Sequence, residues 1–84
     1  MRLTEQARVL LETGKVDDAI TTLERAMNLN PSNGQNYYYM AEAWLRKGNS
    51  SQAREFNRLA AMYLKNDPNW IGQVKDQQER IRAR

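Results

Sequence analysis

The sequence predicts an all-α domain of two helical hairpins followed by one further helix. Apolar residues recur at spacings of three and four, which is the period of one helix face, and no segment alternates as a strand would. The two hairpins also repeat each other at one constant spacing, called the repeat offset below, where five positions are identical between them: Ala7/Ala41, Leu11/Leu45, Gly14/Gly48, Ala19/Ala53 and Ala26/Ala60. Four of these pairs are alanine or glycine, the residues that permit close helix crossings and tight chain reversals.

The first hairpin is expected to reach Pro31. Its first helix carries the stripe Leu3, Ala7, Leu10 and Leu11. Gly14 ends that helix, because glycine tolerates the left-handed conformation that terminates helices. Asp17 and Asp18 then favour a helix start, since carboxylates stabilise the positive end of the helix dipole. The apolar face of this second helix continues through Ala19, Ile20, Leu23, Ala26, Met27 and Leu29.

The second hairpin follows the break at Pro31, where Ser32 with Gln35 matches a capping box for the third helix. That helix shows Tyr37, Met40, Ala41, Trp44 and Leu45, and ends at Gly48. Ser50 or Ser51 is expected to cap the fourth helix, which runs through Ala53, Phe56, Leu59, Ala60, Tyr63 and Leu64. We expect the small residues to meet at close crossings, Ala7 with Ala19 and Ala41 with Ala53.

The fifth helix is expected to start at Asp67 and Pro68, a capping aspartate followed by proline at the first helical position. One side carries Trp70, Val74 and Ile81, and the other carries Gln73, Lys75, Asp76, Glu79 and Arg80. Such a one-sided helix is suited to cover the open end of a helical stack.

These residues resemble the tetratricopeptide repeat, a helix–turn–helix unit whose period equals the repeat offset of this chain. The first repeat carries Leu3, Gln6, Ala7, Leu10, Gly14, Ala19, Leu23, Ala26 and Pro31, and the second Tyr37, Met40, Ala41, Trp44, Gly48, Ala53 and Ala60. The resemblance implies two hairpins in a right-handed superhelical stack, at residues 1–33 and 34–67, with a capping helix over 68–84. Asn57 departs from the pattern, since an aromatic residue is usual there. Lys65 replaces the closing proline, which predicts a fourth helix about one turn longer than the second.

Enzymatic chemistry is not expected in this chain. Its 84 residues include no cysteine and no histidine, which removes the commonest nucleophiles, bases and metal ligands, and no metal or cofactor is expected. The serines and paired aspartates are interpreted as helix-start residues, and Gly34 and Gly48 do not form a phosphate-binding loop.

The compartment is left open between the cytoplasm and the bacterial periplasm. No signal-peptide pattern or membrane-spanning run is seen in the sequence. The hairpin pair is also broadly similar to repeat segments of bacterial envelope lipoproteins, and the chain is interpreted as a fragment of a longer protein.

A partner-binding groove is the main functional hypothesis. Neighbouring helical residues point about 100° apart, so Tyr37 is expected in the core and Tyr38 on a second stripe with Glu42 and Leu45. The resemblance implies that this stripe lines a concave groove, whose candidate residues are Thr4, Arg8, Leu11, Glu12, Gln35, Tyr38, Glu42, Leu45 and Arg46. The two leucines and Tyr38 would form an exposed apolar strip with a charged rim, which suits a peptide or short helix.

Several alternatives stay open beside the groove. A clamp for a C-terminal carboxylate, known in some family members, would use the places of Thr4, Arg8 and Tyr39, of which only Arg8 is suitable. The module could instead pack against its parent chain or a second copy. Nucleic-acid binding is a weaker alternative: the net charge is +3, and nine basic residues follow Asn30. A charge-led convex surface through Arg54, Arg58 or Arg80 would replace the groove if the groove does not bind. Trp44 and Trp70 are interpreted as packing residues, not as a ligand cage.

Overall fold

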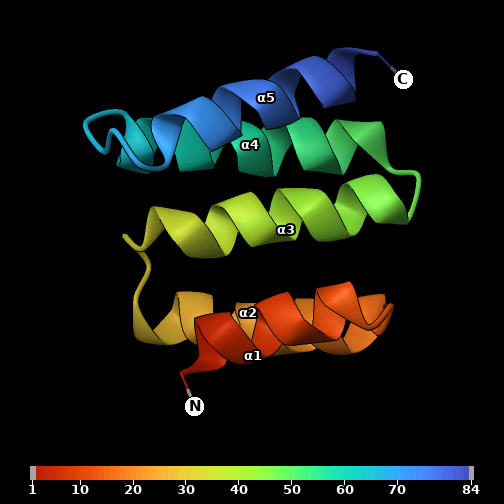
Figure 1. Cartoon of the computed structure of the whole chain (residues 1–84). Helices are drawn as coiled ribbons and strands as arrows, with labels where there is room; N and C mark the ends of the chain where they lie inside the picture. The colour runs from red at the N-terminus through yellow and green to blue at the C-terminus, as the bar shows by residue number, and fades with distance from the viewer. Residues whose placement is uncertain (1, 84) are drawn as a thin grey trace.

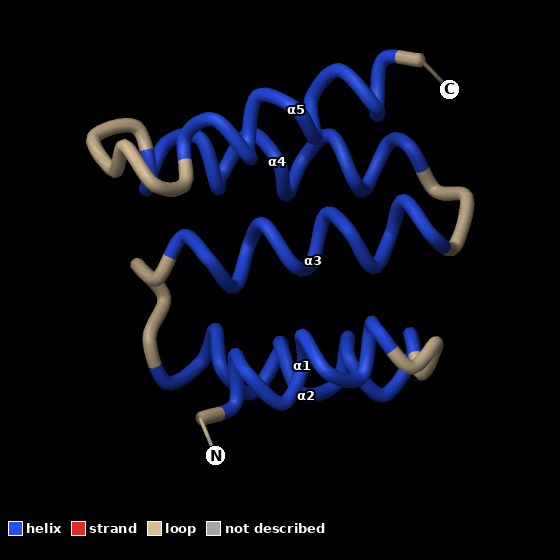
Figure 2. Tube along the Cα trace, viewed as in Figure 1, coloured by secondary structure: helices blue, strands red, loops and turns tan. Residues whose placement is uncertain are grey.

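The computed structural model describes residues 2–83, and this range contains five α-helices and no strand. The helices are α1 (Leu3–Glu12), α2 (Val16–Leu29), α3 (Gly34–Arg46), α4 (Ser50–Leu64) and α5 (Ile71–Arg82). They lie side by side in a stack, with the start of α1 and the end of α5 at opposite ends (Figure 1). Short loops join them, as the tube view makes plain (Figure 2). The all-α prediction of paired hairpins is confirmed.

Helix α3 is the centre of the stack, because it contacts all four other helices. The most extensive contacts lie within the two hairpins, between α1 and α2 and between α3 and α4. Helix α3 also packs on α2 and α1, and α5 packs on α4 and α3. The fifth helix therefore continues the stacking order of the first and third helices.

Both hairpins reverse direction through the same glycine turn. Gly14 and Gly48 have φ of +82° and +80°, in the left-handed region that favours glycine. The N–H groups of Gly14 and Lys15 donate to the carbonyls of Leu11 and Leu10 at 3.1 and 2.8 Å. The two corresponding bonds of the second turn are both 3.0 Å long. The predicted turn glycines are confirmed, together with the helix ends that they cap.

The small residues are buried as expected, since Ala7, Ala19, Ala41 and Ala53 have no exposed surface. Ala7 packs with Leu23 and Met40, and Ala19 packs with Leu11 and Ala43. In the second hairpin Ala53 packs with Leu45 and Ile81. The close crossings of Ala7 with Ala19 and of Ala41 with Ala53 stay predictions.

Asparagines, not serines, cap α3 and α4. The side-chain carbonyl of Asn33 accepts a hydrogen bond from the N–H of Gln35 at 3.1 Å. Asn49 accepts from the N–H of Gln52 at 3.0 Å in the same way. The predicted Ser32 and Ser50 or Ser51 caps are wrong, because each helix starts directly after its asparagine and Ser50 already lies inside α4.

The start of α5 and the length of α4 also differ from expectation. Asp67 accepts a hydrogen bond from the N–H of Asn69 at 2.9 Å, which holds residues 67–70 in a turn before α5 begins at Ile71. Helix α4 has 15 residues and α2 has 14, so the predicted extra turn is absent. Leu29, predicted on the apolar face of α2, is 78% exposed because it is the last residue of the helix.

Candidate functional site

A depression of about 220 Å³ lies between α1, α3 and α5 and is called the groove below. It is lined by Arg8, Leu11, Glu12, Tyr38, Tyr39, Glu42, Arg46 and Gln73. All of these except Tyr39 and Gln73 belong to the predicted set. The sequence offered one indication that Tyr39 lies at the groove, because Tyr39 occupies one of the positions of the carboxylate clamp. Gln73 was missed because α5 was interpreted as a cap, whereas it forms one side of the groove.

The expected leucine strip is not exposed in this structure. Leu11 is 3% exposed and is covered by Ala43 of α3. Leu45 is 4% exposed and is covered by Ile81 of α5. Leu11 still borders the groove, whereas Leu45 does not line it. The large residue shared by the two repeats thus packs under the next helix of the stack, which is why the expectation of an exposed strip is wrong.

The remaining predicted residues lie at the ends of the helices. The hydroxyl of Thr4 donates to Oδ1 of Asn36 at 2.7 Å, which ties the start of α1 to the start of α3. Gln35 is half-buried in the first turn of α3. Neither residue lines the groove.

Tyr38 and Tyr39 form an aromatic wall of the groove, and Trp70 packs beside them without lining it. The rings of Tyr38 and Tyr39 meet edge to face at 5.3 Å between centroids, and Trp70 approaches both, at 5.4 and 5.9 Å. All three side chains are half-buried, so each keeps part of its surface for another molecule. Edge-to-face pairs hold the rings in fixed positions and present a preformed apolar surface. Tyr37, as predicted, is buried in the core.

Most charges around the groove are already paired within the chain. Arg8 forms ion pairs with Glu5 and Glu12. Glu42 pairs with Arg80 and accepts a further hydrogen bond from Gln77 at 3.1 Å. Arg46 donates to the main-chain carbonyl of Leu11, and no carboxylate pairs with it in the described part of the chain. Arg46 is therefore the cation of the groove that is best placed to meet a carboxylate of another molecule.

Burial raises the pKa of Tyr38 above its ordinary value of 10.0, and the nearby carboxylate of Glu42 raises it further. Burial likewise raises the pKa of Tyr39. Both phenols consequently stay protonated at neutral pH and can donate hydrogen bonds. The groove combines two such donors, an aromatic wall and one uncompensated cation.

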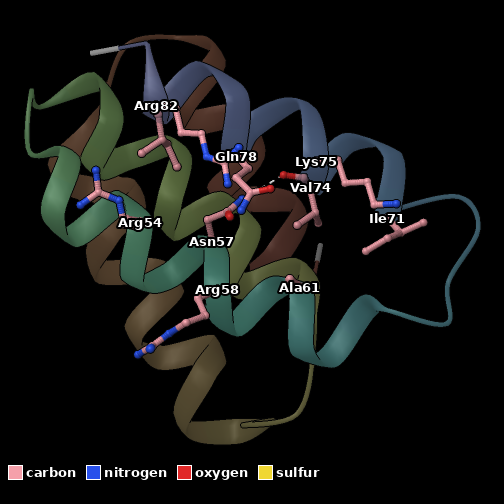
Figure 3. Close-up of a pocket in the computed structure, with 10 residues that line it drawn as sticks. Arg54, Asn57, Arg58, Ala61, Ile71, Val74, Lys75, Gln78 and Arg82 are labelled. Atoms are coloured by element: carbon pink, nitrogen blue, oxygen red, sulfur yellow. Dashed lines mark hydrogen bonds between the residues drawn. The ribbon is translucent and has the colours of Figure 1, made fainter.

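A second hollow, of about 500 Å³, lies between α4 and α5 (Figure 3). Arg54, Arg58, Lys75 and Arg82 stand around an apolar floor that includes Val74 and Ile71. The first two of these cations were singled out as part of the alternative convex surface. This hollow is called the α4/α5 hollow below.

Comparison with known proteins gives one family match. A family model described as tetratricopeptide repeat matches residues 6–72, a range that runs from α1 into the first turn of α5. A comparison with curated proteins gives no significant match. Among the described residues, no helix has the length and apolar character that crossing a membrane requires.

Proposed function

The chain belongs to the tetratricopeptide repeat family, whose members generally mediate protein–protein interactions, and from this premise we propose that the groove binds a short peptide segment of a partner protein. The segment is extended or helical, and it makes its main contacts with Tyr38, Tyr39 and Arg46. The chain acts as a scaffold and carries no catalytic group. This last point is supported by the absence of histidine and cysteine from the sequence.

One observation carries the proposal: the groove is lined by positions that correspond between the repeats. Arg8 corresponds to Glu42, and Glu12 corresponds to Arg46, each pair being one repeat offset apart, and all four line the same depression. A surface built by stacking equivalent helix faces is the usual binding surface of a helical-repeat protein.

The chemistry of the groove defines the partner segment. A half-buried aromatic wall favours an apolar or aromatic side chain of the partner, since such anchors account for most of the affinity at protein interfaces. Arg46 favours a carboxylate beside that anchor. The surface is small, so affinity should be weak, about micromolar.

A selection experiment tests this proposal. Peptides are selected against the intact chain from a random library, and their affinities are measured by fluorescence anisotropy. Arg46→Gln removes the uncompensated cation, and Gln73→Arg places a larger side chain in the groove. We expect each to weaken the selected peptides by about 1–2 kcal/mol.

Matched controls are available on other surfaces. Arg25→Gln and Gln52→Arg make the same chemical changes at exposed positions outside both hollows. If the controls reduce binding as much as the groove variants do, the groove is not the binding surface. Tyr38→Ala is a poorer test, because Tyr38 also packs on Trp70.

Self-association is the second candidate function, and one feature favours it. Leu29, Met62 and Tyr63 are exposed by 78%, 53% and 43%, and they lie at or near the ends of α2 and α4. Exposed apolar side chains of this size are common at contacts between copies of a chain. Sedimentation at several concentrations separates the candidates: a mass that rises with concentration, and no longer rises after Leu29→Ser and Met62→Ser, would favour self-association.

A further inference from the structure

We propose that the α4/α5 hollow is a second docking site, which accepts an acidic amphipathic helix of a partner protein. The helix would pack on α5 as α4 packs on α3, and one of its side chains would reach the seam between α4 and α5 as Phe56 reaches the cluster of Leu23 and Met40. It would insert a large apolar side chain into the hollow and place carboxylates against the surrounding cations.

Helix α5 is placed as the opening helix of a third repeat. Thr4 of α1 contacts Asn36 at the start of α3. Tyr38 stands one repeat offset after Thr4, and Trp70 one repeat offset after Asn36, and these two residues are in contact just before α5. Deeper in the stack, Leu23 packs with Met40, and the corresponding Asn57 donates to the carbonyl of Val74 at 3.0 Å. Helix α5 thus repeats the contacts of α3.

The seam between α2 and α3 is filled by a side chain of α4, whereas a hollow remains beside the seam between α4 and α5. Phe56 of α4 packs on the cluster of Leu23 and Met40, which closes the seam between α2 and α3. The corresponding Asn57 and Val74 lie at the bottom of the α4/α5 hollow, where they are 4% and 2% exposed. The half-buried side chains of Ala61 and Ile71 form the accessible apolar part of the hollow, and no described helix packs over it. The hollow therefore has the place and the apolar floor of a site that a helix with a Phe56-like side chain fills elsewhere in this chain.

The charge around the hollow is positive. Its lining contains the cations Arg54, Arg58, Lys75 and Arg82 and no carboxylate. Arg58 pairs with Glu55 and Arg82 pairs with Glu79, both on the outer surface. Arg54 and Lys75 have no ion-pair partner in the part of the chain that the structure describes, and they stand on opposite helices of the hollow (Figure 3). Acidic residues on an entering helix would complement these exposed cations.

Lys75 argues against a further repeat or a second copy as the occupant. It stands one repeat offset after Ala41, at the position that is alanine in both earlier repeats and has no exposed surface there. A long cationic side chain at this position keeps another helix from approaching as closely as α4 approaches α3. A carboxylate on the incoming helix would form an ion pair with Lys75.

The site is separate from the groove. Gln73 of α5 lines the groove, while Lys75 lines the hollow, and side chains two residues apart point to nearly opposite sides of a helix. Binding at the hollow can therefore succeed or fail independently of the proposed peptide site.

A synthetic peptide derived from α4 provides the probe. It has the sequence of Ser50–Leu64 with acetylated and amidated ends, and both of its arginines are replaced by glutamine. Glutamate replaces two residues of the peptide. One is Gln52, which lies one turn before Phe56, and the other is Asn57, which lies next to Phe56 on the packing side. The peptide is titrated into the isotope-labelled intact chain, and amide shifts are followed by NMR. We expect binding, with the largest shifts at Arg54, Val74 and Lys75.

Two control peptides and one pair of protein variants locate the contacts. In one control peptide alanine replaces Phe56, and in the other lysine replaces the two introduced glutamates; both peptides should bind more weakly than the probe. The protein variant Arg54→Glu with Lys75→Glu should weaken the acidic peptide by about tenfold or more, whereas Arg25→Glu with Lys65→Glu, an equal change of net charge elsewhere, should not. Melting followed by circular dichroism checks that both variants fold.

Four outcomes would overturn the proposal. The first two are equal binding of the acidic and lysine peptides, and unchanged binding of the acidic peptide to the Arg54→Glu/Lys75→Glu variant. The third is self-association of the chain that this variant abolishes. The fourth is tighter binding of a single-stranded oligothymidylate than of the acidic peptide through the same two cations. The fourth outcome would indicate that a nucleic-acid phosphate backbone occupies the site. Such a backbone binds the cations and makes no contact with the apolar floor.

Discussion

Gly34 shows at the scale of one residue how closely the second hairpin is packed. It is the first residue of α3 and is buried against the end of α4. A Cβ atom added there would lie 2.5 Å from Cγ of Leu64 and 3.0 Å from Cβ of Tyr63. Leu64 is itself buried, so it has little room to move. Glycine is required here by the approach of two helices, not by a turn.

Replacing Gly34 tests this close approach. We expect Gly34→Ala to lower the free energy of unfolding by about 1–3 kcal/mol, because the methyl group must displace Leu64. Gly72→Ala is the matched control: nothing lies within 4 Å of its Cβ position, and it lies in the first turn of α5. That change should be neutral or raise the free energy of unfolding by up to about 1 kcal/mol. Urea unfolding that ranks the two variants the other way would contradict the packing described.

At the scale of the element, α5 is held in register by a chain of buried amides. The Nδ2 group of Asn57 donates to the Val74 carbonyl at 3.0 Å and to Oε1 of Gln77 at 2.9 Å. Nε2 of Gln77 donates in turn to the carbonyl of Tyr38 at 2.9 Å. Sliding α5 by one turn would leave these buried groups unpaired, which is costly. This network explains why asparagine stands where the family usually has an aromatic residue.

A double-mutant cycle measures the coupling in this network. Asn57→Ala and Gln77→Ala should each destabilise the chain, and the double variant should lose less than the sum by about 0.5–3 kcal/mol, because each single change already breaks the shared bond. Asn57→Ala combined with Arg25→Ala, on the exposed surface of α2, should be additive. Additivity in both cycles would mean that the two amides act independently.

For the whole molecule, α5 closes one end of a small stack. Val74 packs with Tyr37, Ala60 and Leu64, and Ile81 packs with Leu45 and Ala53. A chain of 84 residues buries a limited fraction of its surface, so the loss of one helix removes a large share of its core.

Removing α5 tests its structural role. We expect a chain that ends at Asn66 to aggregate or to lose cooperative melting, because the apolar surface under Val74 and Ile81 would meet water. The full chain with Lys75→Ala is the control, since Lys75 is exposed and the helix remains. If the shortened chain stays monomeric and melts cooperatively at the same temperature, α5 is not needed to close the stack.

The sequence by itself determined the fold class, the two hairpins and their turns. Helical periodicity reports which face of each helix is buried, and Gly14 and Gly48 mark reversals that few other residues permit, so these features are local. The family resemblance also placed the groove at Arg8, Tyr38 and Arg46, because equivalent positions of stacked repeats face the same side.

The tertiary structure decided which of these faces stay accessible. Leu11 and Leu45 have the spacing of a surface stripe, yet α3 and α5 cover them, and this depends on how neighbouring helices are offset. The same stacking packs Ala7 with Leu23 and Met40. It also leaves a hollow beside Ile71 and Lys75, because no described helix packs on the outer side of α5. Periodicity gives the direction in which a side chain leaves its own helix. The exposure of that side chain is set by the other helices that pack against this helix.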